Sequence, residues 1–194
     1  METLQLDLNK RYTFADYLTW MDDKRRELIN GFVKLMSPAP KIIHQRISRK
    51  LTLKLGIFLE NKSCEMFYSP ADVRLPNNGE TSNDKIYTVV QPDLFVVCDK
   101  GKLDEKGCLG APDFIIEILS KSSAKHDAKT KYALYEKHGV KEYWIVHPEE
   151  QTVLVYILNE SGKFENVGIF AQDEKVKVNI FDDFYIDLGE VFEA

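Results

Sequence analysis

The stretch that decides the fold is Phe114-Ile-Ile-Glu-Ile-Leu119, which is apolar at every position except Glu117. A run that is apolar on both faces is typical of a β-strand covered on both sides of its sheet, so we expect the central strand here. A helix from about Ser123 to His138 should follow and stop at Gly139, after which 142–146 returns to strand-like residues. Strand, helix and strand in succession predict a parallel crossover.

The chain before this unit predicts a helix, a hairpin and a second helix. Thr13 precedes Asp16 by three residues, as in a capping box, and should open a helix that runs to about Arg26. Asn30-Gly31 favours a tight turn between strands at 27–29 and 32–36. Apolar residues then recur at intervals of three or four, which predicts one face of a long helix: Ile43, Ile47, Leu51, Leu55 and Phe58.

Short β-type runs fill most of the remaining chain. They occur at 66–68, 73–75, 88–90, 94–98, 153–158, 164–170 and 176–181. The last three should be antiparallel strands that complete the domain. The predicted fold is therefore α+β, similar to an α/β/α arrangement: a mixed sheet flanked by helices, with an N-terminal helix and hairpin, in a single domain over residues 1–194.

Composition limits the class of protein. The net charge of −5 argues against a general polybasic coat for nucleic acid, and 44% hydrophobic residues are enough for a core. The longest apolar run, 153–158, is far shorter than the ~20 residues of a membrane-spanning helix. Cys64, Cys98 and Cys108 are odd in number and scattered, and the N-terminus lacks a secretory signal, so we expect a reduced, cytoplasmic protein.

Glu117 is the most informative residue, because a buried carboxylate needs a metal ion, a lysine or a proton to compensate it. Asp93 stands where a neighbouring strand begins, and Asp127, Lys131 and Tyr135 share one face of the following helix. Two carboxylates and an ammonium around one point would suit Mg²⁺ and phosphodiester hydrolysis. Taken singly, each of three residues also fits a structural role. Glu117 could form a buried ion pair, Asp93 could be a turn residue, and Lys131 could be a solvated helix lysine.

Several motifs together resemble one known family. They are Arg26-Glu-Leu-Ile-Asn-Gly31, Ser37-Pro-Ala-Pro40 with His44, Gln91-Pro-Asp93, Pro112-Asp-Phe-Ile-Ile-Glu-Ile-Leu-Ser120, Asp127 with Lys131 and Tyr135, and Gly139-Val-Lys-Glu-Tyr-Trp-Ile-Val146. In this order they are similar to the Uma family, of the DUF820 type, within the PD-(D/E)XK superfamily of restriction-endonuclease-like proteins. The match covers residues 12 to about 156.

The resemblance implies roles for specific residues. Asp93 and Glu117 would bind the metal together with the backbone carbonyl of Ile118. The catalytic lysine of the superfamily would fall at Leu119, so the resemblance is to a branch in which a lysine of the next helix takes that role: Lys131, or less suitably Lys129.

The resemblance also suggests which residues surround this site. It places Glu27 and His44 beside the same cleft, although Glu27 could equally close the hairpin and His44 could equally cap its helix. Asp127 and Tyr135 would orient Lys131.

Two basic segments could contact phosphates. Residues 41–59 contain no acid, and 121–131 has four lysines against one aspartate. The proposed nucleic-acid contacts are Arg46, Arg49, Lys50, Lys121, Lys125 and Lys129. A solvated helix face is the alternative, and no motif indicates which sequence would be read.

The sequence supports three functional hypotheses. The first is a DNA endonuclease that requires Mg²⁺, with Mn²⁺ as a substitute, and that acts as a homodimer if both strands are cut. The second is a nuclease-like fold without turnover that serves as a DNA-binding or protein-interaction module; Leu119 in the lysine position keeps this alternative open. The third is a phosphatase or another hydrolase of small substrates.

Overall fold

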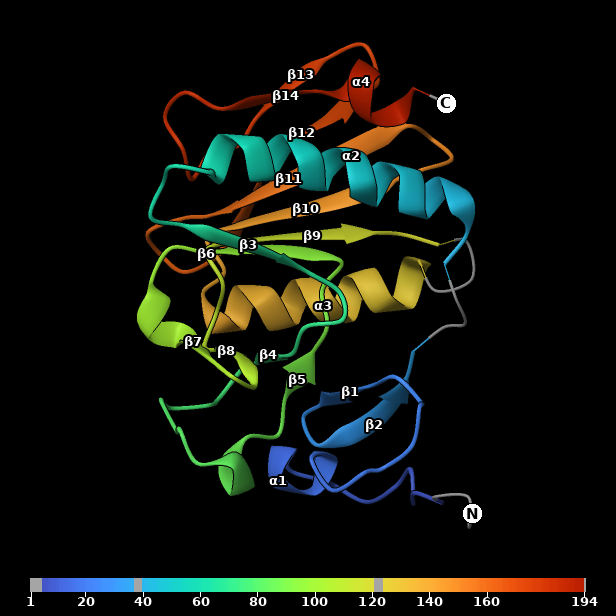
Figure 1. Ribbon diagram of the computed structural model, residues 1–194, viewed down its shortest axis with the longest axis vertical. Helices are drawn as coiled ribbons and strands as arrows, with labels where there is room; N and C mark the ends of the chain where they lie inside the picture. Colours follow the sequence, from blue (N-terminus) through green and yellow to red (C-terminus); the bar gives the residue numbers. More distant parts are fainter. Residues whose placement is uncertain (1–4, 37–39, 121–123, 194) are drawn as a thin grey trace.

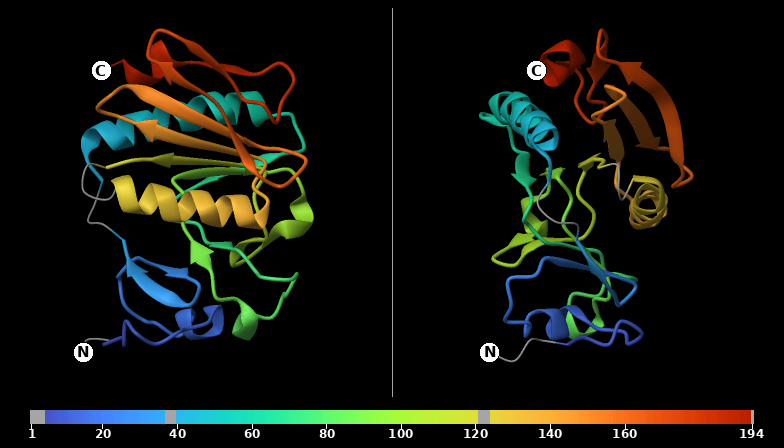
Figure 2. Two further views of the ribbon diagram at one scale, coloured as in Figure 1. Left: turned by 180° about the vertical axis from the view of Figure 1, so that it is seen from behind. Right: turned by 90° about the vertical axis from the view of Figure 1, so that its right-hand side faces the viewer.

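The computed structural model describes residues 5–36, 40–120 and 124–193, with 124–128 as backbone only. The larger sheet has the strand order β12-β11-β10-β9-β6-β3, in which β9 and β10 pair in parallel and the other pairs are antiparallel. These strands are Glu65–Tyr68 (β3), Leu94–Val97 (β6), Phe114–Ile118 (β9), Glu142–His147 (β10), Thr152–Leu158 (β11) and Phe164–Ala171 (β12). Helix α2 (Ile42–Leu59) covers one face and helix α3 (Ala124–His138) covers the other (Figures 1 and 2).

The central position predicted for the Phe114 run is confirmed. All five residues of β9 are buried, and successive side chains alternate between two cores. Phe114 and Ile116 pack with α2, whereas Ile115 packs with α3. Glu117 shares the parity of Ile115, so its side chain also lies on the α3 side. The sequence thus places one carboxylate inside the layer between the sheet and α3.

A second six-stranded sheet, which the sequence did not predict, lies below the first in Figure 1. Its order is β2-β1-β5-β4-β8-β7, with strands Arg26–Ile29 (β1), Phe32–Leu35 (β2), Val73–Arg74 (β4), Val89–Val90 (β5), Leu103–Asp104 (β7) and Gly107–Leu109 (β8). The predicted hairpin is confirmed as β1–β2. Asn30 and Gly31 both have positive φ, at 52° and 88°, which matches the twist that a two-residue turn requires.

The first helix is much shorter than predicted. Thr13 and Asp16 do form a capping box, but α1 spans only Phe14–Tyr17. The expected extension to Arg26 is wrong because the chain tightens immediately: the amides of Thr19 and Trp20 bond to carbonyls three residues back. Met21 is 92% exposed, so it adds no buried apolar contact that would stabilise a longer helix.

The C-terminal region contains one correction. Strands β11 and β12 form as predicted, but the run 176–181 does not join them. Instead β13 (Lys175–Lys177) pairs with β14 (Tyr185–Asp187) in a separate two-stranded sheet, and the short helix α4 (Leu188–Phe192) follows. Buried residues of this region, such as Val176 and Val191, complete the core under α2.

The expectation of fully reduced cysteines is wrong, because Cys64 and Cys98 form a disulfide. Strands β3 and β6 are antiparallel neighbours with Glu65 opposite Val97, so the residues just outside that pair face each other. Cys108 is free and buried. None of the helices in the described ranges combines the length and the apolar character needed to cross a bilayer.

Candidate functional site

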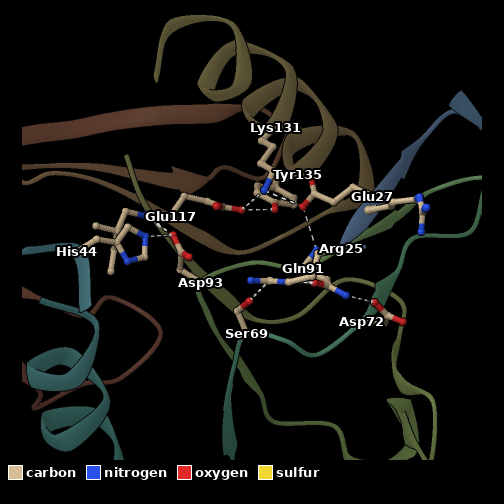
Figure 3. A network of polar contacts seen from close by, with 12 residues as sticks. Arg25, Glu27, His44, Ser69, Asp72, Gln91, Asp93, Glu117, Lys131 and Tyr135 are labelled. Atoms are coloured by element: carbon tan, nitrogen blue, oxygen red, sulfur yellow. Dashed lines mark hydrogen bonds and ion pairs between the residues drawn. The ribbon is translucent and has the colours of Figure 1, made fainter. Parts of the chain in front are cut away.

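Polar side chains converge at the edge of the larger sheet where β9 ends. Figure 1 shows that α2 and α3 both begin at this edge, above the β1–β2 hairpin. Strand β6 is antiparallel to β9, so Asp93 at its start lies beside the end of β9. The hairpin contributes Glu27, α2 contributes His44, and α3 contributes Lys131 (Figure 3).

The centre of the site is the ammonium of Lys131. Its Nζ lies 2.9 Å from Oε1 of Glu117 and 2.9 Å from Oε1 of Glu27. Tyr135, one helical turn further along α3, donates a hydrogen bond of 2.7 Å to the same Glu117 oxygen. These side chains are buried, with Lys131 only 9% exposed. The spacing of four that sequence analysis noted therefore brings both groups of α3 to Glu117.

The charges of this cluster shift its proton affinities. Burial raises the pKa of Glu117 from 4.5 to about 7; Lys131 opposes this rise, and the carboxylates of Asp93 and Glu27 add to it. Burial works against the charged form of Lys131, but Glu117 and Glu27 raise its pKa above the ordinary value. Lys131 is therefore a cation held between the side chains of Glu117 and Glu27.

Asp93 forms the second part of the site. Its Oδ2 accepts a hydrogen bond of 2.7 Å from the backbone amide of Ile118 and lies 3.2 Å from Nε2 of His44. Burial lowers the proton affinity of His44, but the hydrogen bond to Asp93 and its charge raise the pKa of the imidazole overall. The side chain of Asp93 is 22% exposed, so this part of the site reaches solvent.

A neutral side chain, Gln91, joins the site to its surroundings. Its backbone amide donates 3.0 Å to Oε1 of Glu27, and its side-chain Nε2 donates 2.9 Å to Oδ1 of Asp72. Its Oε1 accepts from Nε and Nη2 of Arg25 at 3.1 and 2.9 Å. Arg25 also donates to Oγ of Ser69 (Figure 3). Sequence analysis did not single out Arg25, Ser69, Asp72 or Gln91, although Gln91 stands in the quoted Gln91-Pro-Asp93 motif.

The basic residues proposed for nucleic acid are placed less uniformly. Arg46, Arg49 and Lys129 are exposed. Lys50 instead donates to the backbone oxygen of Glu193, which ties α2 to the C-terminal segment. Lys121 and the side chains of Lys125 and Asp127 lie outside the described residues.

Among the described residues, no group of three or more His, Cys, Asp or Glu side chains lies close enough to hold a metal ion. A divalent cation here would therefore need few side chains, a backbone oxygen and water, which is how Mg²⁺ is commonly bound. Asp93, Glu117 and the carbonyl of Ile118 are the oxygen donors of suitable type. Their acidic surroundings favour such a cation electrostatically.

Comparison with solved structures identifies the class of fold. A crystal structure described as "a putative nuclease belonging to DUF820", from Anabaena variabilis ATCC 29413, matches with a TM-score of 0.73. The alignment covers 93% of this chain and 97% of that chain at 22% sequence identity. This establishes the predicted nuclease-like α+β fold.

Sequence comparison identifies the family. Residues 14–189 match the Uma2 family model, described as "Putative restriction endonuclease", and the chain belongs to this family. An uncharacterized protein of Synechocystis, slr1290, is 26% identical over 176 residues, which cover 89% of this chain and 88% of that protein. The resemblance noted from the sequence motifs is confirmed.

Proposed function

We propose that the protein is a metal-dependent DNA endonuclease that hydrolyses phosphodiester bonds. The observation that carries the proposal is the contact between Lys131 and Glu117 at 2.9 Å, with Asp93 immediately before the adjacent strand β6. The ammonium stands beside the carboxylate although Leu119 occupies the usual lysine position. The fold of a nuclease family supports the same reaction class.

The charge state of each side chain indicates its role in the proposed reaction. Lys131, with its raised pKa, stays protonated at neutral pH, so it orients the attacking water and counters charge on the phosphoryl oxygens rather than acting as a base. Glu27 holds the ammonium of Lys131 directly, and Tyr135 holds it through Glu117. His44 and the amide of Ile118 fix the carboxylate of Asp93. The reaction forms a bond from the water oxygen to phosphorus, breaks the bond from phosphorus to the leaving oxygen, and moves one proton of the water by way of solvent to that leaving oxygen.

A divalent cation fits the donor set. Asp93, Glu117 and the carbonyl of Ile118 would hold Mg²⁺, or Mn²⁺ in its place, and the ion would supply Lewis-acid activation of water and phosphate. The carboxylates of Glu27, Asp93 and Glu117 gather around this position, and a divalent cation would stabilise their ionised forms.

A plasmid nicking assay tests the proposal. Wild-type protein should convert supercoiled plasmid to nicked or linear forms with Mg²⁺ or Mn²⁺, and EDTA should stop the reaction. Asp93→Asn and Glu117→Gln should each reduce the rate by about 100-fold or more. Glu142→Gln is the matched control, because it replaces another buried glutamate outside the site. Cleavage that persists in both acid variants would refute the assignment.

Other outcomes separate the alternatives. DNA binding without cleavage in any divalent metal would favour a binding module, and hydrolysis of a simple phosphodiester without DNA affinity would favour a small-substrate hydrolase. A homodimer would provide two sites for cutting both strands. Sedimentation at the assay concentration tests this, and a monomer that linearises plasmid would exclude the dimer requirement.

A further inference from the structure

Arg25 is an exposed arginine whose guanidinium is held in place at the rim of the candidate site. Nε and Nη2 both donate to Oε1 of Gln91, and Nη2 also donates to Oγ of Ser69. Several hydrogen bonds on one planar group fix its orientation, so less side-chain entropy remains to be lost when it binds a ligand.

The oxygens that hold Arg25 are neutral, which distinguishes it from the other arginines nearby. Arg26 pairs with Asp22 at 2.5 Å, and Arg74 pairs with Asp104 at 2.6 Å. Arg25 forms no ion pair with any carboxylate in the described ranges. Its position is thus fixed while its positive charge is not neutralised by a direct partner.

Gln91 is itself oriented from behind. Its Nε2 donates to Oδ1 of Asp72 at 2.9 Å and lies 3.4 Å from the hydroxyl of Tyr17. Because the carboxamide nitrogen is engaged by Asp72, the oxygen on the other branch of the group is the atom that accepts from Arg25. The support runs from Asp72 through Gln91 to the guanidinium, and Gln91 is only 8% exposed.

Gln91 also connects Arg25 to the acids and the lysine of the candidate site. The backbone amide of Gln91 bonds to Glu27, which in turn binds Lys131, and Asp93 follows Gln91 by two residues. Figure 3 shows Arg25 beside Glu27 and Gln91. An anion that approached Asp93 and Lys131 along this rim would meet a positioned guanidinium.

We propose that Arg25 binds a backbone phosphate of the nucleic acid next to the phosphodiester that is cleaved. Guanidinium matches phosphate in charge and in the geometry of its donors. The inference rests on the proposed function and adds a substrate contact to it. The competing explanation is that Arg25 only fastens the start of the hairpin to the end of β3.

The test is binding of a fluorescein-labelled DNA duplex of about 20 base pairs, followed by anisotropy without divalent metal between about 50 and 200 mM salt. Arg25→Gln should weaken binding about fivefold or more at the lowest salt and reduce the slope of log Kd against log salt by about one. Lys24→Gln is the matched control. It removes the same charge from the exposed neighbouring residue and should bind like wild type.

Ser69→Asp separates phosphate binding from fastening. A carboxylate at this position would still hold Arg25, now as an ion pair, so thermal stability should be maintained while DNA affinity falls. Wild-type affinity in this variant, or equal affinity of Arg25→Gln and Lys24→Gln, would overturn the role of Arg25 alone. Absence of DNA binding by wild type would overturn the endonuclease assignment as well. Binding that depends on Arg25 without any cleavage would leave this inference standing and remove only the catalytic assignment.

Discussion

Two buried glutamates on neighbouring strands, Glu117 of β9 and Glu142 of β10, have opposite surroundings. Glu142 is completely buried on the α2 side and accepts from neutral donors: Nε1 of Trp144 at 2.7 Å, Nδ2 of Asn179 at 3.1 Å and the amide of Ile180 at 2.9 Å. Glu117 accepts from the ammonium of Lys131 and lies near other acids. Burial raises the pKa of both. Burial and a shifted pKa are therefore shared by a structural and a candidate catalytic carboxylate; the charged neighbours distinguish them.

The largest effect is expected from Lys131→Met. It leaves Glu27 and Glu117 buried without a cation, so the free energy of unfolding should fall by about 3–5 kcal/mol and cleavage should be lost. Urea denaturation measures the first quantity and plasmid nicking the second. A variant that is as stable as wild type would mean that Lys131 does not compensate these acids.

Glu142→Gln should act on stability alone. An amide has one oxygen instead of two, so some donors around it lose their acceptor, and unfolding free energy should fall by about 1–3 kcal/mol. Cleavage by the folded protein, measured well below its melting temperature, should match wild type. A loss of activity comparable with that of Glu117→Gln would erase the distinction between the two glutamates.

Tyr135→Phe should have a smaller effect that is specific to the site. Loss of its hydrogen bond to Glu117 costs about 0.5–1.5 kcal/mol and removes a contact that lowers the pKa of that carboxyl. The acidic limb of the cleavage rate should therefore move to higher pH. Tyr143→Phe is the control, because the buried hydroxyl of Tyr143 has no partner within the described structure. That variant should be as stable as wild type or more stable, with an unchanged pH profile.

The pH dependence of stability tests how the pKa of Glu117 differs between the folded and unfolded states. The pKa of Glu117 is higher when folded, about 7, than its ordinary 4.5, so the native state binds more protons between these values. Its contribution to stability is thus complete below pH 4.5 and is lost as pH rises through about 7. Glu117→Gln should flatten this part of the curve of unfolding free energy against pH. An unchanged curve would show that Glu117 has the same pKa in the folded and unfolded states.

The sequence revealed those parts of the site that depend on local spacing. The isolated acid in an apolar strand identified Glu117, and helical periodicity placed Lys131 and Tyr135 on one face. The contacts of Arg25 with Gln91 and Ser69 were not predictable, because they join residues 66 and 44 positions apart whose meeting depends on how the two sheets pack.

The errors have similar causes. The second sheet consists largely of strands of two or three residues, which carry too little alternation to reveal their pairing. The disulfide depends on the register between β3 and β6 rather than on cysteine spacing. The early end of α1 could not be predicted from the capping box, because a longer helix would also need buried contacts and Met21 is exposed.

Glu27 belongs to the hairpin of the smaller sheet, yet its carboxylate binds the ammonium of Lys131 from α3, which covers one face of the larger sheet. The contact between Glu27 and Lys131 therefore both connects the smaller sheet to α3 and forms part of the candidate site. A change that loosened the hairpin should therefore abolish the proposed cleavage at temperatures where the protein is still folded. Circular dichroism would report the fold and the plasmid assay would report cleavage, so the two losses can be measured separately.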